Sequence, residues 1–284
     1  MTRIVTNEWR GGTADAVPSC PACGAADRAL HASRVFDNLN PASSDLWTFW
    51  RCSNCLSLYP DPRPSADSIA DAYVEYYTHD VDRPSPQSKL RRWSVSMVNG
   101  YMSKRFHASL RPMSMLGMVL FTLIEPLRLK LDYHGRHLYM ADTTRARRLL
   151  DIGSGNGEFL KRAITLGWRA VGLDPDPGAV RACIEQGLDA YEGFADNDAA
   201  ALSGPFDAIT LRHSIEHVSD PGSDLRHCLR RLRPGGMIWL AWPNPQGAGA
   251  RLFRSAWRGL EAPRHLCIPS ARAMHDMLID AGFI

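Results

Sequence analysis

The sequence of 284 residues lacks the features that mark several special classes of protein. Lys and Arg exceed Asp and Glu by only three (33 against 30), so bulk charge gives no argument for nucleic acid as a partner. The longest nearly uncharged apolar run, residues 113–124, falls short of the ~20 residues that a membrane-spanning helix needs. Residues 1–12 lack the apolar core of a secretory signal. A globular protein of the reducing cytoplasm is therefore expected.

Seven cysteines are present, and in a reducing compartment they indicate metal ligands or free thiols before disulfides. Four of them form two CxxC pairs, which are Cys20 with Cys23 and Cys52 with Cys55. Each CxxC turn directs two thiolates at one ion, so the two turns complete a tetrahedral zinc site. A four-thiolate site has no open position for substrate, so a structural role in a small N-terminal lobe is expected. The alternative is a pair of redox dithiols.

A basic segment follows the cysteine lobe. Residues 85–150 hold twelve Lys or Arg against three Asp or Glu, a net charge of +9. Long aliphatic residues recur at helical spacing, and Pro112 and Pro126 divide the segment into two or three helices. Three interpretations stay open for this helical cap: steering of a phosphate-bearing substrate, contact of residues 113–131 with an anionic membrane, or an ordinary solvated lid.

Strands and helices alternate from residue 147 onward. The expected strands are residues 149–152, 170–173, 188–191, 206–211 and 237–241, and the expected helices are residues 158–166, 177–186, 220–232 and 270–281. Buried strands separated by helices indicate a doubly wound parallel sheet of the α/β class, with a Rossmann-like arrangement. The chain ends at residue 284, where a further strand is expected, so the last strands are expected to be missing. A shorter helical pattern covers residues 65–77.

A glycine-rich loop lies between the first of these strands and its helix. It reads Asp151-Ile-Gly-Ser-Gly-Asn-Gly157, and the second strand ends in Asp174. Glycines allow a ligand to lie against the strand end, and an acid about twenty residues later can accept hydrogen bonds from a ribose. The acid before the first glycine suits an ammonium group and repels a pyrophosphate, which disfavours an NAD-linked oxidoreductase. A tight turn with a helix cap is the structural alternative.

These motifs resemble the class I S-adenosylmethionine-dependent methyltransferases, and the similarity covers residues 147–284. By that resemblance, Asp174 holds the ribose and Phe194 or Ala195 lies near the adenine. The cofactor-binding candidates that the resemblance implies are Asp151, Gly153, Ser154, Gly155, Asn156, Gly157, Asp174, Pro175, Phe194 and Arg212. The resulting division is an N-terminal zinc-binding lobe at 1–84, a basic helical cap at 85–146 and a cofactor-binding methyltransferase domain at 147–284.

Candidate catalytic residues follow the strand at 206–211, where open α/β sheets place their functional loops. His217 is the candidate base, with Glu216 beside it to raise its basicity. The segment resembles sugar C-methyltransferases, in which an equivalent Glu-His pair serves deprotonation, and ubiquinone-pathway O-methyltransferases, in which such residues are associated with a divalent cation. Base, metal ligand and structural loop residue therefore all stay open for His217. Arg264 and His265 form a second candidate pair for substrate contact.

The zinc lobe is also similar to that of the sugar C-methyltransferases and related bacterial enzymes of polysaccharide and natural-product biosynthesis. Tyr73, Tyr76 and Tyr77 fall where that lobe can face the acceptor, or they pack as an aromatic helix face. The basic cap departs from that family's pattern. The expected function is methyl transfer from S-adenosylmethionine to an O- or C-nucleophile of a sugar, nucleotide sugar or secondary metabolite. The alternative is a cofactor-binding regulatory or nucleic-acid-binding protein without turnover.

Overall fold

The computed structural model describes residues 12–37, 45–73, 88–139 and 147–284. The chain divides into two compact units. The described residues of the first unit are 12–37, 45–73, 212–230 and 240–284, and those of the second are 88–139, 147–211 and 231–239. The C-terminal residues thus cluster with the N-terminal lobe, which the linear division at residues 84 and 146 does not anticipate.

The second unit contains the predicted doubly wound sheet, and the α/β fold class is confirmed. Its order is β10-β9-β6-β7-β8, and β6 pairs in parallel with both β7 and β9. The chain therefore places β7 and β8 on one side of β6 and then returns to place β9 and β10 on the other side. This reversal is the switch point where doubly wound sheets bind their ligands. The strands are β6 (Arg147–Ile152), β7 (Trp168–Asp174), β8 (Ala190–Glu192), β9 (Phe206–Arg212) and β10 (Leu232–Ala241).

The spacing of apolar residues and the capping residues explain the helices of this unit. In α4 (Glu158–Thr165) the apolar residues Leu160 and Ala163 are buried, at the spacing of one helical face. Asp176 caps α5 (Pro177–Glu185) by accepting a hydrogen bond from the Gly178 N–H, and Pro177 stands at its first position. A 3-10 turn, η3 (Ala200–Leu202), precedes β9.

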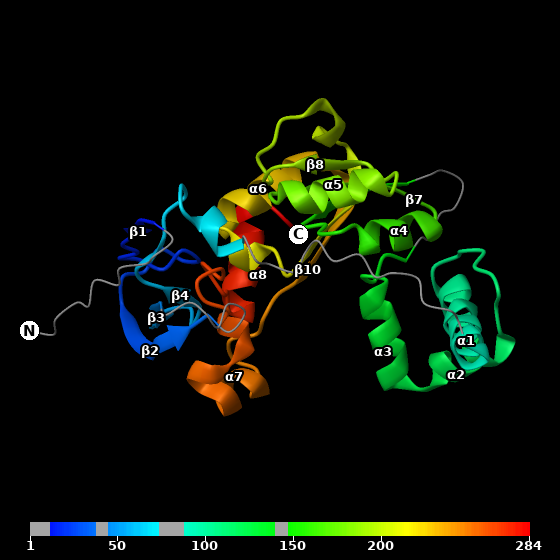
Figure 1. The fold of residues 1–284 in the computed structure, drawn as a ribbon, viewed down its shortest axis with the longest axis horizontal. Helices are drawn as coiled ribbons and strands as arrows, with labels where there is room; N and C mark the ends of the chain where they lie inside the picture. Colours follow the sequence, from blue (N-terminus) through cyan, green and yellow to red (C-terminus); the bar gives the residue numbers. More distant parts are fainter. Residues whose placement is uncertain (1–11, 38–44, 74–87, 140–146) are drawn as a thin grey trace, which may run out of the picture. The chain divides into compact units, whose positions relative to one another are not determined.

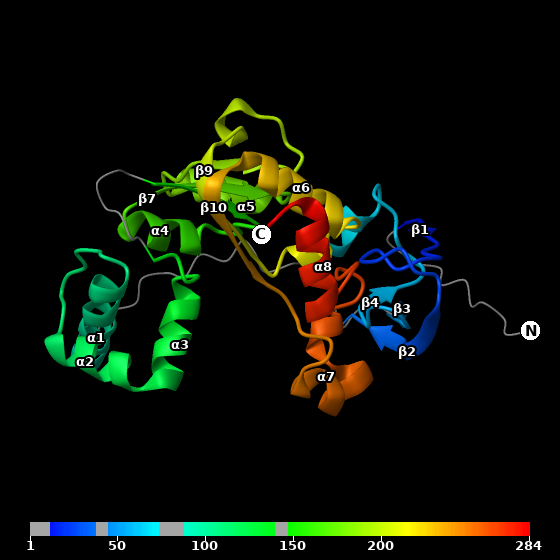
Figure 2. The same cartoon turned by 180° about the vertical axis from the view of Figure 1, so that it is seen from behind.

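The basic segment forms three helices, as its two prolines predict. They are α1 (Lys89–Arg105), α2 (Met115–Leu123) and α3 (Glu125–His134). Figure 1 and Figure 2 both show α1 and α2 lying side by side. A Cβ at Gly117 would lie 2.1 Å from the carbonyl oxygen of Met97, so only glycine permits this close helix contact.

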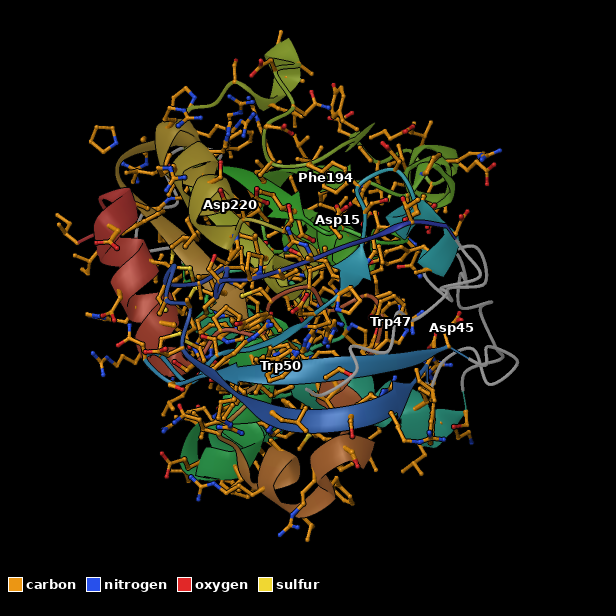
Figure 3. All side chains as sticks on the ribbon, turned by 90° about the vertical axis from the view of Figure 1, so that its left-hand side faces the viewer. Asp15, Asp45, Trp47, Trp50, Phe194 and Asp220 are labelled. Atoms are coloured by element: carbon orange, nitrogen blue, oxygen red, sulfur yellow. The ribbon has the colours of Figure 1, made fainter. Side chains whose placement is uncertain are left out.

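The first unit holds a small sheet that sequence analysis did not anticipate. Its antiparallel order is β2-β3-β4, and a separate pair joins β1 to β5. Trp47 and Phe49 of β3 are buried on one face, against Ile268 and Leu260 from the C-terminal part of the chain. Figure 3 labels Trp47 and Trp50 on this strand. The strands are β1 (Ala14–Asp15), β2 (Arg28–Phe36), β3 (Leu46–Cys52), β4 (Leu58–Pro60) and β5 (Arg63–Pro64).

Hydrogen bonds fasten the C-terminal segment to this sheet. Leu58 and Ile268 exchange backbone hydrogen bonds of 3.0 and 2.8 Å, and the Ser270 hydroxyl donates to the Cys55 carbonyl. Ser270 is also the N-cap of α8. The remaining helices of the unit are η1 (Ile69–Tyr73), η4 (Ile215–His217), α6 (Pro221–Arg231), α7 (Ala248–Phe253), η5 (Arg254–Ala256), η6 (Arg258–Leu260) and α8 (Ala271–Ala281).

Two expectations need correction. The helical pattern predicted over residues 65–77 forms only the short 3-10 helix η1 within the described residues, because residues 65–68 form a turn in which the Ser65 N–H and the Ser68 hydroxyl donate to the Thr13 carbonyl. The strand expected at residues 237–241 begins five residues earlier, at Leu232, so the Pro-Gly-Gly sequence lies within β10. No helix among the described residues is long and apolar enough to cross a membrane.

Candidate functional site

The glycine loop leaves β6 at the switch point of the sheet. Its three glycines have positive φ values of 76°, 53° and 79° at Gly153, Gly155 and Gly157. A Cβ on Gly157 would lie 2.5 Å from Leu188, so this position needs glycine for packing as well as for conformation. A Cβ on Gly155 would meet nothing within 4 Å, so the backbone faces open space there. The loop therefore offers a bare backbone to a ligand.

Asp174 connects this loop to the end of β7. The Gly155 N–H donates to Oδ2 of Asp174 over 2.8 Å, and the Asp176 N–H donates to Oδ1 over 3.0 Å. Burial raises the pKa of the Asp174 carboxyl, and these two backbone donors oppose that shift. Each carboxylate oxygen keeps a second lone pair, so the side chain retains the capacity to accept hydrogen bonds from two ribose hydroxyls.

Asp151 has a cationic partner that sequence reasoning missed. Its carboxylate is fully buried and accepts hydrogen bonds from the Arg136 guanidinium and, over 2.8 Å, from the Thr210 hydroxyl. Arg136 lies in the turn after α3, and its guanidinium stacks 3.5 Å from the ring centre of Phe159. No local pattern marks Arg136 among the twelve cations of the basic segment. Its contacts tie that segment to the first strand of the sheet.

The other predicted cofactor residues lie at or near the carboxyl ends of the strands. Phe194 follows β8 and is 53% exposed, so its ring is accessible to an adenine base (Figure 3). Asn156 uses its side-chain oxygen to accept the Glu158 N–H over 3.2 Å. Ser154 is buried and Pro175 is exposed. Arg212 is the exposed last residue of β9 and clusters with the first unit, whereas the other candidates belong to the second.

The catalytic candidates form a compact cluster in the first unit. Glu216, His217 and His265 each offer a ligand atom, and these atoms lie within 4.8 Å of one another. The imidazole rings of His217 and His265 meet edge to face, with centroids 4.6 Å apart. Glu216 is fully buried, and its Oε1 lies 3.2 Å from Nδ1 of His213 and 3.9 Å from Nε2 of His265. Its Oε2 has no hydrogen-bond partner among the residues that the structure describes.

Both imidazoles of the cluster are held neutral at physiological pH. Burial lowers the pKa of His217 to about 4, and the neighbouring His265 adds to that shift. Burial likewise lowers the pKa of His265 to about 3. The Gly259 carbonyl lies 2.8 Å from Nδ1 of His265, which fixes the proton on that nitrogen and leaves Nε2 with a lone pair facing Glu216 and Glu261. Each neutral ring therefore keeps a lone pair that can bind a cation, while burial makes each ring a weaker base than a free imidazole.

The remaining candidate residues differ in what they contact. The Tyr73 hydroxyl lies 2.8 Å from Nδ1 of His217, so the lobe tyrosine and the candidate base are in contact. Tyr76 and Tyr77 lie outside the described residues. Arg264 is 2% exposed, and its guanidinium binds both carboxylate oxygens of Asp37. Its partners show that Arg264 links two parts of the fold instead of facing a substrate.

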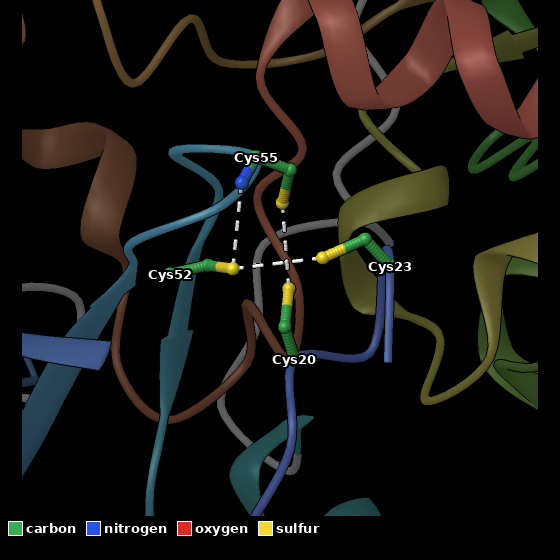
Figure 4. A group of neighbouring side chains, drawn as sticks. All are labelled: Cys20, Cys23, Cys52 and Cys55. Carbon is green, nitrogen blue, oxygen red and sulfur yellow. Dashed lines mark hydrogen bonds between the residues drawn. The ribbon is translucent and has the colours of Figure 1, made fainter. Parts of the chain in front are cut away.

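The four lobe cysteines come together from the two predicted turns (Figure 4). Sγ of Cys20 lies 3.6 Å from Sγ of Cys55, and Sγ of Cys23 lies 3.5 Å from Sγ of Cys52. Bonds of about 2.3 Å to a tetrahedral zinc ion separate sulfurs by about 3.8 Å, so the donor set fits zinc in type, number and spacing. The metal itself remains a prediction.

The family comparison bears on the second half of the chain. The family model described as "Methyltransferase domain" matches residues 125–284. An enzyme of Xanthomonas oryzae pv. oryzae named "Ubiquinone biosynthesis O-methyltransferase" is 34% identical over 127 residues, which cover 43% of this chain and 51% of that protein. A protein of the same name from Caulobacter vibrioides is 37% identical over 102 residues, covering 34% of this chain and 40% of that protein. The chain thus spans about half the length of these curated relatives, or less.

A solved S-adenosylmethionine-dependent methyltransferase from Archaeoglobus fulgidus has 21% sequence identity and a TM-score of 0.44, over 65% of this chain and 73% of that chain. At that TM-score the likeness adds nothing to the family match. The matched residues 125–284 include the glycine loop, Asp174 and the Glu216-His217 segment, and they make up more than half of the chain. The chain belongs to the methyltransferase domain family, of the class I S-adenosylmethionine-dependent type.

Proposed function

We propose that this chain transfers the methyl group of S-adenosylmethionine to a nucleophilic oxygen or carbon of a small-molecule acceptor. The observation that carries the proposal is the glycine loop with its buried partner Asp174, joined by the 2.8 Å hydrogen bond from Gly155. The loop has the positive-φ glycines and the acidic strand end that an adenosine ligand needs. An aromatic ring at Phe194 is available for the adenine.

Methyl transfer from a sulfonium is an in-line displacement, so the protein aligns the donor and the acceptor and takes up the acceptor's proton. We assign proton removal to His217, acting through Tyr73. Nδ1 of His217 accepts the Tyr73 O–H, and a hydrogen bond between the ring and the Arg264 backbone raises the pKa of His217. The acceptor proton passes to the Tyr73 oxygen while the Tyr73 proton passes to His217. Glu216 positions the loop that carries the ring.

Tyr73→Phe and His217→Gln test this assignment together. Both variants are expected to lower turnover by 10²-fold or more, the range of a general base, while the affinity for S-adenosylhomocysteine stays within twofold of wild type. Tyr133→Phe, at an aromatic pair with Trp239 in the second unit, is the matched control. Full activity of Tyr73→Phe beside an inactive His217→Gln would remove the relay and leave direct deprotonation.

A divalent cation is a second candidate occupant of the same cluster. The buried Oε2 of Glu216, without a hydrogen-bond partner among the described residues, and the lone pair on Nε2 of His265 favour it. Metal analysis of the full chain beside His265→Gln separates the two sites, because His265 is not a ligand of the cysteine site. A second divalent ion in the wild-type protein, lost on His265→Gln, would support the cation; one ion at most, unchanged by His265→Gln, and unchanged turnover in chelator would reject it.

The acceptor is proposed from chemistry and relatives together. The relatives reported above are named for ubiquinone biosynthesis, whereas the zinc lobe resembles sugar methyltransferases, so both a phenol and a nucleotide sugar belong in the first screen. Formation of S-adenosylhomocysteine is the readout. Turnover with any acceptor of the panel supports methyl transfer. Cofactor binding without turnover on an extended panel would favour a regulatory protein. A cytoplasmic location and a structural zinc ion are part of the same proposal.

We also propose that α2 contacts an anionic membrane surface. Met115, Leu116, Val119 and Leu123 are 51–76% exposed on this one short helix. Exposed cations lie on the segments that precede and follow α2 in the chain, at Lys89, Arg91, Arg92, Arg111 and Lys130. Exposed apolar residues flanked in the chain by cations suit a bilayer with anionic headgroups.

Flotation with phosphatidylglycerol vesicles tests the membrane contact. The wild-type protein is expected to float with these vesicles and not with phosphatidylcholine vesicles. Leu116→Glu with Leu123→Glu is expected to abolish flotation, and Ile184→Glu, at a similarly exposed residue of α5, is expected to leave it intact. Equal flotation of all three proteins, or none by the wild type, would overturn the proposal.

A further inference from the structure

A cavity of about 400 Å³ lies within the first unit, and none of its lining residues has a role assigned above. His31 of β2 and Arg51 of β3 line one side of it. Pro245, Gln246, Arg251 and Arg254 line the other, from the segment that includes α7 and η5. Its volume lies within the range of pockets that hold small molecules.

Arginines supply the charge of this cavity's lining, and its other residues are neutral. Three of its residues are arginines, and none of its residues carries a carboxylate. Arg51 donates to Nδ1 of His31 over 3.1 Å, so the proton of the neutral ring lies on Nε2. Burial and the charge of Arg51 lower the pKa of His31, which keeps the ring neutral. The buried Nε2 donor has no acceptor among the described residues. The cavity thus presents donors and positive charge.

The backbone at Arg254 is strained. Arg254 has φ of +47° and ψ of −116°, between the end of α7 and the start of η5. Glycine would adopt this conformation at lower cost. The arginine found there lines the cavity from the turn where α7 ends. Strained non-glycine residues cluster at functional sites, ligand clamps among them. The strain falls on one of the three cationic residues of the cavity.

We propose that this cavity binds the phosphate or diphosphate group of a small-molecule ligand. Guanidinium groups match phosphate oxygens in geometry and form paired charge-assisted hydrogen bonds with them. Three of them around one concave site suit the charge of a diphosphate better than that of a single carboxylate. The inference rests on the proposed function in one respect, which is that the ligand is the methyl acceptor. Anion binding itself does not depend on methyl transfer.

Calorimetric titration of the zinc-loaded protein with inorganic pyrophosphate tests the site. Binding is expected in the micromolar range at low salt, and it should weaken as salt is raised. Arg51→Gln and Arg254→Gln should each weaken binding about tenfold or more. Arg258→Gln is the matched control, because Arg258 is an exposed arginine of the adjacent turn η6 that does not line the cavity. Thermal unfolding and zinc content establish that each variant is folded.

A second titration with a nucleoside diphosphate identifies the source of the phosphate. Tighter binding than that of pyrophosphate, with the same loss on Arg254→Gln, would assign a nucleotide-linked ligand; equal binding would assign the phosphate end alone. Absence of pyrophosphate binding, or equal binding by Arg254→Gln and Arg258→Gln, would overturn the proposal. Retention on RNA without pyrophosphate binding would overturn it in favour of nucleic acid. Cofactor binding measured on the same samples reports separately on the proposed function.

Discussion

Removal of the Arg136 guanidinium leaves the Asp151 carboxylate buried without its cation. We expect Arg136→Met to lower the free energy of unfolding by about 3–5 kcal/mol at pH 7.5, the usual cost of breaking a buried ion pair from one side. Asp151 is fully buried and would lose its cation while retaining the 2.8 Å hydrogen bond from Thr210. Methionine also removes the guanidinium that stacks on Phe159, so part of the loss comes from that contact.

The pH dependence of this variant separates charge from packing. A carboxyl that loses its cation in a buried place takes up a proton more readily, so the destabilisation should shrink between pH 7.5 and pH 5. Arg136→Met with Asp151→Asn should be about 2 kcal/mol more stable than Arg136→Met alone, because the amide carries no charge.

Urea denaturation followed by circular dichroism measures these differences. Arg162→Met is the matched control, since Arg162 pairs with the exposed Glu158 over 3.4 Å and should contribute less than about 1 kcal/mol. A loss below about 1 kcal/mol for Arg136→Met, or a loss that does not change with pH, would refute the account of this ion pair.

Three further predictions follow from other parts of the structure. The free energy of unfolding should fall as the pH is lowered, because His265 has a pKa of about 3 in the folded protein and its ordinary value of 6.5 in the unfolded chain. Between pH 7.5 and pH 5 this residue should account for a drop of about 2 kcal/mol. Urea denaturation of His265→Gln at the two pH values should lack that part of the drop. Because the pKa of His217 is lowered to about 4, kcat/KM should stay flat from pH 5.5 to 8, whereas a titration of activity near pH 6.5 would contradict the neutral His217. Cys52→Ser should reduce bound zinc from about one ion to near zero, as measured by atomic absorption, and the β2-β3-β4 lobe should then become sensitive to proteolysis. Cys228→Ser, at a buried cysteine outside the cluster, should keep its zinc.

Local sequence patterns predicted most of the fold of the second unit. Buried apolar runs at β6, β7 and β9 predicted a parallel sheet, and the structure confirms it. The glycines of the loop predicted positive φ, because the motif places them where a strand must turn into a helix, and all three have it. Two CxxC turns predicted the meeting of four cysteines across 28 intervening residues, because two such turns together supply the four thiolates of one zinc site, and the structure brings the four together.

Contacts between distant segments could not be predicted in the same way. Arg136 belongs by sequence to the helical cap, and only folding brings it to Asp151. His265 joins Glu216 through a loop almost fifty residues later, although the sequence indicated it only as a partner of Arg264. The β2-β3-β4 sheet was missed because its strands mix polar and apolar residues irregularly around a register shift between Leu30 and Val35. The bounds of the predicted domains stay predictions.

The measurement that tests the central claim most directly is a calorimetric titration with S-adenosylhomocysteine, run beside NADH and beside an Asp174→Ala variant. Asp174 holds the glycine loop through Gly155 and is the predicted ribose ligand. The account predicts micromolar binding of S-adenosylhomocysteine, no binding of NADH, and a loss of at least tenfold in the variant, the scale of one lost charged hydrogen bond. Binding of NADH instead, or binding of S-adenosylhomocysteine that Asp174→Ala leaves unchanged, would contradict it.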